Sequence, residues 1–323
     1  MIDYISTYKE IQIDEKQFSP SKWIRISSKY GYCYFHNKNS VDIKYYPLSQ
    51  KIWISGKIST LFSNSQVTNV DDIFGANINK FIESVNKVLQ KLFDIDKVDI
   101  RDFKVARIDY CFNVETPYVT QYLEFLSEAF QHKSRGRRTD FTYDRNLSGS
   151  VYIKPTSEYN NNQKKSYCLN FYDKIDWIYH QKEKNIYVSP NDEELATDVF
   201  RLEVQCYSNK VKGICKKYHM DNTFGNLCDI SVAYNTICEV YKNLFGGDEN
   251  CSYVQYGETK NVKFTPTVKE QLKLSSQHHS ITTYAAQEAI KKGIYPYYFL
   301  PSNGEVKRLE NPMMLILNKI SQL

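Results

Sequence analysis

Three short segments, far apart in the chain, alternate apolar and polar residues as strands do, and each places reactive groups on its polar face. The segments are residues 107–112, 169–174 and 200–205. Side chains two apart in a strand point to the same face. If the three strands are neighbours in one sheet, two carboxylates, a phenol and several cations meet on one surface, which is the equipment for metal-assisted attack of a tyrosine on a phosphodiester. The polar faces carry Arg107, Asp109 and Asn113, then Asn170, Tyr172 and Lys174, and finally Arg201, Glu203 and Gln205.

The remaining patterns predict an α+β fold with an antiparallel-rich central sheet and flanking helices. Clusters of Asn, Pro and Ser separate three β-rich runs between residues 30 and 59, which is typical of a meander. Apolar residues at helical spacing predict helices over 77–94 and 116–132, the second with Thr116 as N-cap and Pro117 in its first turn. Two helices on such a sheet form a sandwich rather than a doubly wound fold. Further strands are expected at 103–114, 149–154, 166–173 and 199–206, with a short helix at 175–184.

After residue 213 the pattern becomes helical, so we predict two domains. Residues 1–213 would form the sheet domain that carries the polar faces, and residues 214–323 a smaller helical module. Such modules serve DNA binding or oligomerisation, and a homodimer is one possibility. Helices are expected in this module at 227–244, 280–292 and 310–321.

Composition excludes several classes of protein. No run of about 18 apolar residues exists, so no membrane span is expected, and the N-terminus shows no secretory signal pattern. The eight cysteines form no Cys-x-x-Cys pair, which indicates a reduced, cytoplasmic protein without structural zinc. No glycine-rich phosphate loop is present. A net charge of +5 permits nucleic-acid binding, and 27 tyrosines among many lysines suit single-stranded DNA, although codon bias in an AT-rich genome also explains them.

At the three segments the chain resembles a known family, the trans-acting Rep replication initiators of small Gram-positive rolling-circle plasmids. More distantly it resembles the filamentous-phage gene II protein. These proteins carry an Arg-hydrophobic-Asp strand, a strand that ends in Tyr-Asp/Asn-Lys, and an Arg-hydrophobic-Glu strand. The matches span about residues 40–206, and their order and spacing make the set more specific than any one motif. Here the motifs read Arg107-Ile108-Asp109, Tyr172-Asp173-Lys174 and Arg201-Leu202-Glu203.

The resemblance implies an endonuclease that nicks and rejoins DNA at a replication origin, with residues 1–213 as its Rep domain. By it, Tyr172 is the nucleophile that forms a covalent phosphotyrosine, and Asp109 and Glu203 are ligands of Mg²⁺ or Mn²⁺, which prefer oxygen donors. Lys174 and Arg107 would steady phosphate oxygens or favour the phenolate. The free 3′-hydroxyl would prime a host polymerase, and a host helicase is an expected partner. The His-hydrophobic-His metal strand of many other rolling-circle initiators is missing, so a full ligand set is not visible.

DNA, as an origin hairpin or a single strand, is the expected partner. The basic stretch 133–138 supplies four candidate phosphate contacts, and the third segment supplies a fifth. A solvated loop is the alternative for the stretch. The candidate DNA-binding residues are Lys133, Arg135, Arg137, Arg138 and Arg201.

Three other functions stay open at this point. A conjugative relaxase uses the same tyrosine chemistry, but its usual histidine cluster is missing. A sequence-specific DNA-binding protein without catalysis would use Asp109 and Glu203 only in ion pairs with Arg107 or Arg201. A structural phage protein would show no salt-dependent affinity for DNA.

Overall fold

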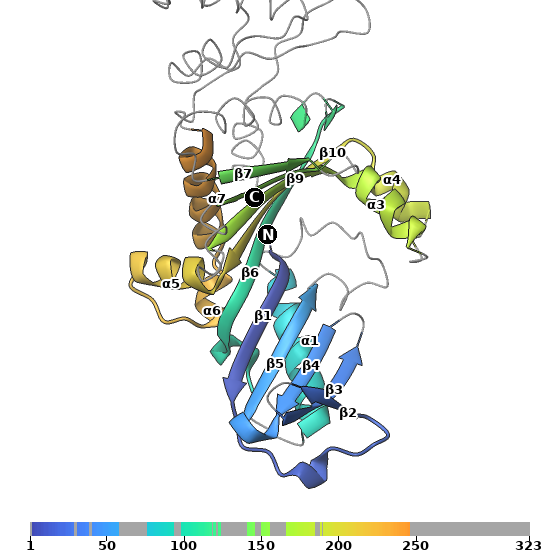
Figure 1. Cartoon of the computed structure of the whole chain (residues 1–323), viewed down its shortest axis with the longest axis vertical. Helices are drawn as coiled ribbons and strands as arrows, with labels where there is room; N and C mark the ends of the chain where they lie inside the picture. The colour runs from blue at the N-terminus through green and yellow to red at the C-terminus, as the bar shows by residue number, and fades with distance from the viewer. Residues whose placement is uncertain are drawn as a thin grey trace, which may run out of the picture.

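One antiparallel sheet organises the molecule (Figure 1). Its ten strands lie in the order β2-β3-β4-β5-β1-β6-β10-β9-β8-β7. The computed structural model describes residues 2–28, 31–38, 41–57, 76–93, 98–117, 119–120, 122–123, 141–145, 150–155, 166–184, 188 and 190–245. The strands are β1 (Ile2–Glu10), β2 (Ile24–Ser28), β3 (Gly31–Lys38), β4 (Val41–Tyr46), β5 (Lys51–Lys57), β6 (Lys104–Glu115), β7 (Phe141–Arg145), β8 (Val151–Pro155), β9 (Tyr167–Asp173) and β10 (Val199–Tyr207).

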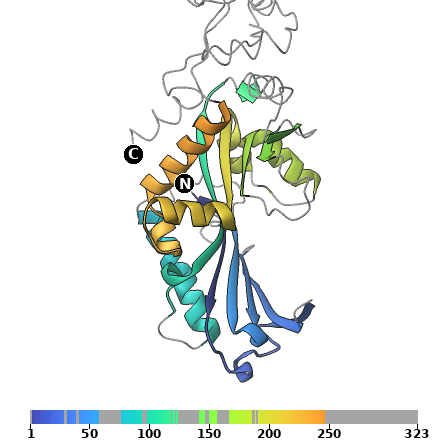
Figure 2. The ribbon, with the colours of Figure 1, turned by 60° about the vertical axis from the view of Figure 1, so that its left-hand side comes forward.

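Helices cover one face of this sheet and one end of it. Figure 2 shows α1, α5 and α7 on the same side of the sheet, with α3 and α4 on the other side. The part of the second side that carries none of the described helices is called the open face below. The helices are α1 (Ala76–Phe93), α3 (Lys174–Glu183), α4 (Pro190–Ala196), α5 (Ser208–Lys217), α6 (Phe224–Leu227) and α7 (Ile230–Phe245), and 3-10 turns lie at Glu15–Gln17, Pro47–Ser49 and Ile100–Asp102.

Strand alternation explains why only one face is covered by α1. In β4 every second residue is buried, and the same holds for β5, so their apolar side chains form one layer beneath the helix. On α1 the buried residues recur at helical spacing, and Phe93 reaches the ring of Phe18 at 5.9 Å. Burying such a side chain contributes about 1.5–3 kcal/mol each. The layer includes Ile43, Ile54, Phe81, Val85 and Leu89.

The α+β prediction is confirmed, with helix α1 and the strands of the meander close to their expected positions. The strand at 149–154 and the strand at 166–173 pair as an antiparallel hairpin, as expected. Of the helix expected at 116–132, the structure describes residues 119–120 and 122–123, which are helical. The basic stretch 133–138 and the helices expected at 280–292 and 310–321 lie outside the described residues.

Two expectations need correction. We expected the sheet to begin near residue 30, but β1 and β2 precede that point, and β1 lies at the centre between β5 and β6. The pairing of β1 with β6 shifts register between Ile2 and Tyr4 and between Ser6 and Thr7, and the buried positions of β1 include the polar residues Asp3 and Thr7, so its hydropathy does not alternate. We also expected the second segment to remain a strand through Lys174. Instead Asp173 accepts a hydrogen bond from the Ile175 amide and begins α3, so Lys174 is the first helical residue.

The expected division after residue 213 falls inside α5, which spans Ser208–Lys217. The helices that follow, α6 and α7, place apolar side chains in the same core as the sheet. Residues 246–323, the larger part of the expected C-terminal module, lie outside the described residues, so that module stays a prediction. Among the described helices, none is both long and apolar enough to cross a bilayer.

Candidate active site on the open face of the sheet

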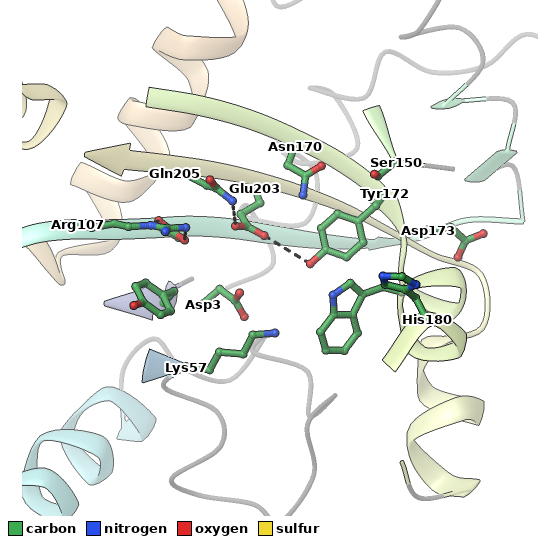
Figure 3. Close-up of a pocket in the computed structure, with 13 residues that line it drawn as sticks. Asp3, Lys57, Arg107, Ser150, Asn170, Tyr172, Asp173, His180, Glu203 and Gln205 are labelled. Carbon is green, nitrogen blue, oxygen red and sulfur yellow. Dashed lines mark hydrogen bonds and ion pairs between the residues drawn. The ribbon is translucent and has the colours of Figure 1, made fainter. Parts of the chain in front are cut away.

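The three segments are neighbouring strands, because β6, β10 and β9 pair in that order. In the register, Arg201 lies opposite Tyr172, Glu203 opposite Asn170, and Gln205 opposite Asp109. Paired residues of an antiparallel sheet share a face, so the expected gathering of phenol, carboxylates and cations is present. It lies on the open face, at the centre of the sheet, where α3 begins (Figure 3).

All of these side chains except that of Arg201 line a cavity of about 350 Å³. Strands β1, β5, β6, β9 and β10 contribute to its wall, and α3 closes one side of it. Most of the lining residues are polar or charged, which is unusual for a space at the middle of a sheet. The lining includes Asp3, Tyr4, Lys57, Arg107, Asp109, Asn170, Tyr172, Asp173, Trp177, His180, Glu203 and Gln205.

Asp109 is a buried carboxylate held by its neighbour two residues along the strand. Its side chain is 1% exposed, and Arg107 donates to its two oxygens from Nε at 2.8 Å and from Nη2 at 2.5 Å. Burial raises the pKa of Asp109 well above its ordinary value, and nearby Glu203 adds to that rise, while Arg107 opposes it. The Arg107 guanidinium also lies 4.7 Å from the ring of Tyr4 and 5.0 Å from that of Tyr207. The carboxylate is therefore fixed in place by a cation that aromatic rings orient.

Tyr172 lies at the floor of the cavity with its phenol directed at Glu203 (Figure 3). The side chain is 5% exposed, and its hydroxyl donates to Glu203 Oε2 at 3.5 Å. Gln205 donates to the other oxygen, Oε1, at 2.8 Å, so both oxygens of Glu203 have partners. Burial raises the pKa of Tyr172 well above its ordinary value, although Arg201 opposes the rise. The phenol is thus protonated in the free protein and already hydrogen-bonded to a group that can accept its proton.

A buried ion pair that the sequence did not indicate lies beneath Tyr172. Arg201 is fully buried, and its Nη2 lies 2.6 Å from Asp3 Oδ1 and donates to the sulfur of Cys111 at 3.2 Å. Burial would raise the pKa of Asp3, but Arg201, Lys57 and Lys174 together hold it well below its ordinary value. Asp3 is the extra residue of the first register shift in β1, which turns its side chain toward this face.

Lys174 is a second buried cation beside the nucleophile candidate. It is 2% exposed, and its Nζ lies 4.4 Å from the ring of Trp177 and 6.0 Å from that of Tyr172. Lys57 reaches the same Trp177 ring at 4.1 Å. Burial, together with repulsion from Arg201 and Lys57, lowers the pKa of Lys174 well below its ordinary value. Lys57 in the cavity wall and Lys174 behind it therefore place positive charge beside Trp177, while Asp109 and Glu203 place carboxylates elsewhere in the wall.

The cavity offers oxygen donors to a divalent cation, but few of them are free. In the described part of the chain no cluster of three or more His, Cys, Asp or Glu side chains could hold a metal. Asn170 Oδ1, beside Glu203 in the register, is buried and lacks a hydrogen-bond partner. The two carboxylates of Asp109 and Glu203 fit Mg²⁺ or Mn²⁺, since these cations bind through one or two carboxylates and keep several waters.

The other predicted residues are placed as follows. Arg201 is buried in its pair with Asp3, which favours support of Tyr172 over direct contact with DNA. Lys133, Arg135, Arg137 and Arg138 lie outside the described residues. Another tyrosine near the cavity, Tyr179, lies on α3 and is 50% exposed. Asp3, Lys57 and Trp177 were missed, because only the packed sheet brings them to the cavity.

A helix-backed antiparallel sheet with a tyrosine, two carboxylates and several cations on its open face is the architecture expected of a Rep-type replication initiator. Comparison with protein families supports that class: the family described as the N-terminal part of the replication-associated gene II protein of phages matches residues 26–223. That is more than half of the chain, and the chain belongs to this family. The expected kinship with the gene II replication protein is therefore confirmed.

Other comparisons add little to this. Among solved structures, the chain is similar to the rolling circle replication initiator protein from Geobacillus stearothermophilus, with a TM-score of 0.34 and 9% sequence identity. The match covers 67% of this chain and 77% of that chain. A search of the curated proteins finds no match.

Proposed function

We propose that the protein initiates rolling-circle replication by nicking one DNA strand at an origin, with Tyr172 as the nucleophile. One observation carries the proposal. In a chain of a replication-protein family, a nearly buried tyrosine points at a carboxylate inside a cavity whose wall holds both cations and further carboxylates. Core tyrosines rarely occupy such surroundings, because burying this many charges is costly unless they serve a purpose.

The reaction would be a transfer of a phosphodiester from DNA to tyrosine. Tyr172 Oη attacks phosphorus, the bond from phosphorus to the 3′-oxygen breaks, and a phosphotyrosyl bond to the 5′ side forms. Glu203, which already accepts from the phenol, receives the phenolic proton, and the 3′-oxygen takes a proton from water. No energy-rich cofactor is consumed, so the reverse reaction rejoins a strand. The free 3′-hydroxyl can prime a polymerase, with a host helicase opening the duplex ahead of it.

The cations beside Trp177 would hold the phosphate. Lys174 and Lys57 both lie against the ring of Trp177, which limits their freedom before DNA arrives. Arg201 lies behind Tyr172 and stabilises the phenolate electrostatically rather than by contact. Arg107 holds Asp109 in place and lies at the outer rim.

A divalent cation belongs to the same proposal. Asp109 and Glu203 would hold Mg²⁺ or Mn²⁺ inside the cavity. A bound cation would supply neutralisation of the phosphate charge. To bind the cation, Asp109 would share its oxygens between the cation and Arg107. Because the pKa of Asp109 is raised, acid would protonate Asp109 and weaken cation binding.

The open face offers a path for the single strand that leaves the cavity. Tyr8 and Trp53 lie opposite each other on β1 and β5, with ring centroids 4.8 Å apart and planes at 24°, and both are partly exposed. Trp53 precedes Lys57 by two repeats of the strand, which is roughly 13 Å. Bases stack on such rings while cations track the backbone. The stacked pair would receive a base about two nucleotides from the nick.

The test is adduct formation. The protein is mixed with single-stranded oligonucleotides that tile its own gene and flanks, with Mn²⁺, and a denaturing gel detects protein–DNA adducts. We expect an adduct that is lost with EDTA and in Tyr172→Phe, and retained in Tyr179→Phe, which alters an exposed tyrosine of α3.

Other results would redirect the proposal. An adduct that survives in Tyr172→Phe keeps the enzyme class and rejects Tyr172 as nucleophile. Loss only in Tyr179→Phe assigns the reaction to that residue. No adduct, with tight binding intact, favours a DNA-binding protein without catalysis. An adduct on transfer-origin DNA instead of a replication origin favours a relaxase.

A further inference from the structure

A basic groove of about 610 Å³ lies between α1 and the edge of the sheet formed by β2 and β3. Three parts of the chain supply its charges: the turn before β2, strand β3 and helix α1. Apolar side chains of Val88 and Leu92 form part of its lining. The cationic or protonatable residues are Lys22, His36, Lys38, Lys87 and Lys91, and this set is called the lysine groove below.

The four lysines of the lysine groove are exposed, and none has an ion pair among the described residues. Elsewhere in the described chain many lysines are paired: Lys9 with Asp102, Lys51 with Glu10, and Lys210 and Lys217 with Glu239. Lysines elsewhere in the described chain are thus neutralised by acidic neighbours, but no described acidic residue lines the groove. Unpaired like charges repel one another, so their gathering is better explained by a ligand than by folding.

Helix α1 shows the same feature in its spacing. Lys80, Lys87 and Lys91, with Ser84 between them, recur at intervals of four, three and four residues, which places them along one exposed stripe. Lysines four apart destabilise a helix slightly. The buried stripe of α1 occupies the opposite side of the helix, so packing does not require this arrangement. A row of cations at helical spacing suits a row of phosphates.

The lysine groove and the Tyr172 cavity lie on opposite faces of the sheet. His36 is paired with Ile43, and Ile43 with Ile54, all on the face that α1 covers. Tyr4 and Lys57 are paired on the open face with the cavity. A single strand in the cavity would have to pass around the sheet edge to reach the groove. The groove is therefore a separate site rather than an extension of the cavity.

The chemistry of the groove favours double-stranded over single-stranded DNA. Sites for single strands combine cations with aromatic rings on which bases stack. Among the described residues that line the lysine groove there is no Phe, Tyr or Trp, whereas the open face presents Tyr8 and Trp53. Lysine heads alone read the phosphate backbone and not the bases. We propose that the lysine groove binds the phosphate backbone of duplex DNA that flanks the nicked strand; this rests on the proposed function.

The test uses charge reversal at a distance from the cavity. In Lys87→Glu/Lys91→Glu, affinity for a fluorescein-labelled duplex of arbitrary sequence, measured by anisotropy at about 0.1 M salt, is expected to fall about tenfold or more. The adduct on single-stranded oligonucleotides is expected to persist. The control is Lys212→Glu/Lys216→Glu on α5, which makes the same charge change at the same helical spacing, on exposed residues. This control is expected to lower duplex affinity much less.

Each alternative outcome has a distinct meaning. Equal losses in the two double variants would show that net charge alone binds duplex, and would overturn the proposal. Loss of the single-strand adduct only in the groove variant would assign the groove to the single strand, and would also overturn it. If no adduct forms in any protein while the groove variant alone loses duplex binding, the groove proposal stands and the proposed nicking fails. Lys87→Gln/Lys91→Gln, with circular dichroism, repeats the test if the reversal impairs folding.

Discussion

The Tyr172 cavity and the lysine groove use cations in opposite ways. In the cavity, Arg201 and Lys174 are buried and stripped of water, and each is fixed by a carboxylate or a ring. In the groove, Lys22, Lys87 and Lys91 are exposed, with no ion pair among the described residues. Buried charges interact strongly and in fixed directions because little water screens them, while water and salt screen exposed charges. The difference separates the site proposed for the reaction from the site proposed to bind duplex DNA.

The largest difference between the Tyr172 cavity and the lysine groove is expected in the free energy of unfolding of their variants. Arg201→Met removes the ion-pair partner of the buried Asp3, and breaking a buried pair in this way costs about 3–5 kcal/mol. Lys87→Met removes a hydrated surface charge and should change the free energy of unfolding by less than about 0.5 kcal/mol. Urea denaturation measures both. The double variant Asp3→Asn/Arg201→Met should regain much of the loss, and equal effects of the two single variants would contradict the distinction.

The next largest difference is expected when an aromatic side chain of the open face is removed, because only single-strand binding should then weaken. Trp53→Ala removes half of the stacked pair on the open face, and loss of one base-stacking ring weakens single-strand binding by about 1–3 kcal/mol. Duplex binding in the lysine groove should be unchanged. Anisotropy with a labelled single strand and a labelled duplex measures both affinities. The exposed-aromatic control Tyr179→Ala should change neither, and a loss of duplex affinity in Trp53→Ala would show that the two surfaces are one.

The salt dependence of duplex affinity should show whether the lysines of the groove contact phosphates. If Lys87 and Lys91 each contact one phosphate, Lys87→Gln/Lys91→Gln should reduce the slope of log affinity against log salt by about 1.8 for duplex DNA, at about 0.9 per contact. The measurement is anisotropy across a salt series. An unchanged slope would mean that these lysines do not contact phosphate, whatever the change in affinity.

The smallest expected effect concerns the rim of the cavity. Burial raises the pKa of Asp173 from 3.8 to about 6, and Asp176 and Asp198 add to the rise. The folded state therefore binds this proton more tightly than the unfolded state, so ionisation destabilises the fold: the cost is absent well below pH 4 and complete above about pH 6. Asp173→Asn keeps a capping side chain without the charge.

Urea midpoints test this at about pH 5 and about pH 7.5. The difference between Asp173→Asn and the native chain should shift in favour of the variant as pH rises. If the difference in stability between Asp173→Asn and the native chain is the same at both pH values, the pKa of Asp173 is not raised by burial. Asp176→Asn, in the first turn of α3, is the matched comparison.

Much of this fold is visible in local patterns, and much of the site is not. Alternation revealed β6, β9 and β10, because their polar faces repeat every second residue, and helical spacing revealed α1. β1 was missed because its buried positions include the polar residues Asp3 and Thr7, so its hydropathy does not alternate as its burial does, and the register shift at Asp3 hid that residue. The start of α3 had a readable signal, since Asp173 is a good N-cap.

The partners of the site depend on packing. Lys57 and Lys174 approach one ring, Trp177, from different elements, and no spacing in the sequence predicts that meeting. The stripe of lysines on α1 could have been read from the helix alone. The sequence could not predict that Lys22 and Lys38 lie in the same groove as these lysines, because that depends on how the edge of the sheet packs against the helix.

The central position of β1 also sets the order in which the molecule is assembled. β1 leaves the ribosome before the other strands and can pair early with β5, but Arg201, the counter-ion of Asp3, arrives only with β10, the last described strand. Pairings between distant parts of a chain form slowly, because the intervening loop must close first. Until β10 docks between β6 and β9, Tyr172 and Asp109 belong to strands that do not touch. An unfinished chain therefore holds the proposed DNA-cleaving residues apart, and the reaction becomes available only when synthesis has passed β10.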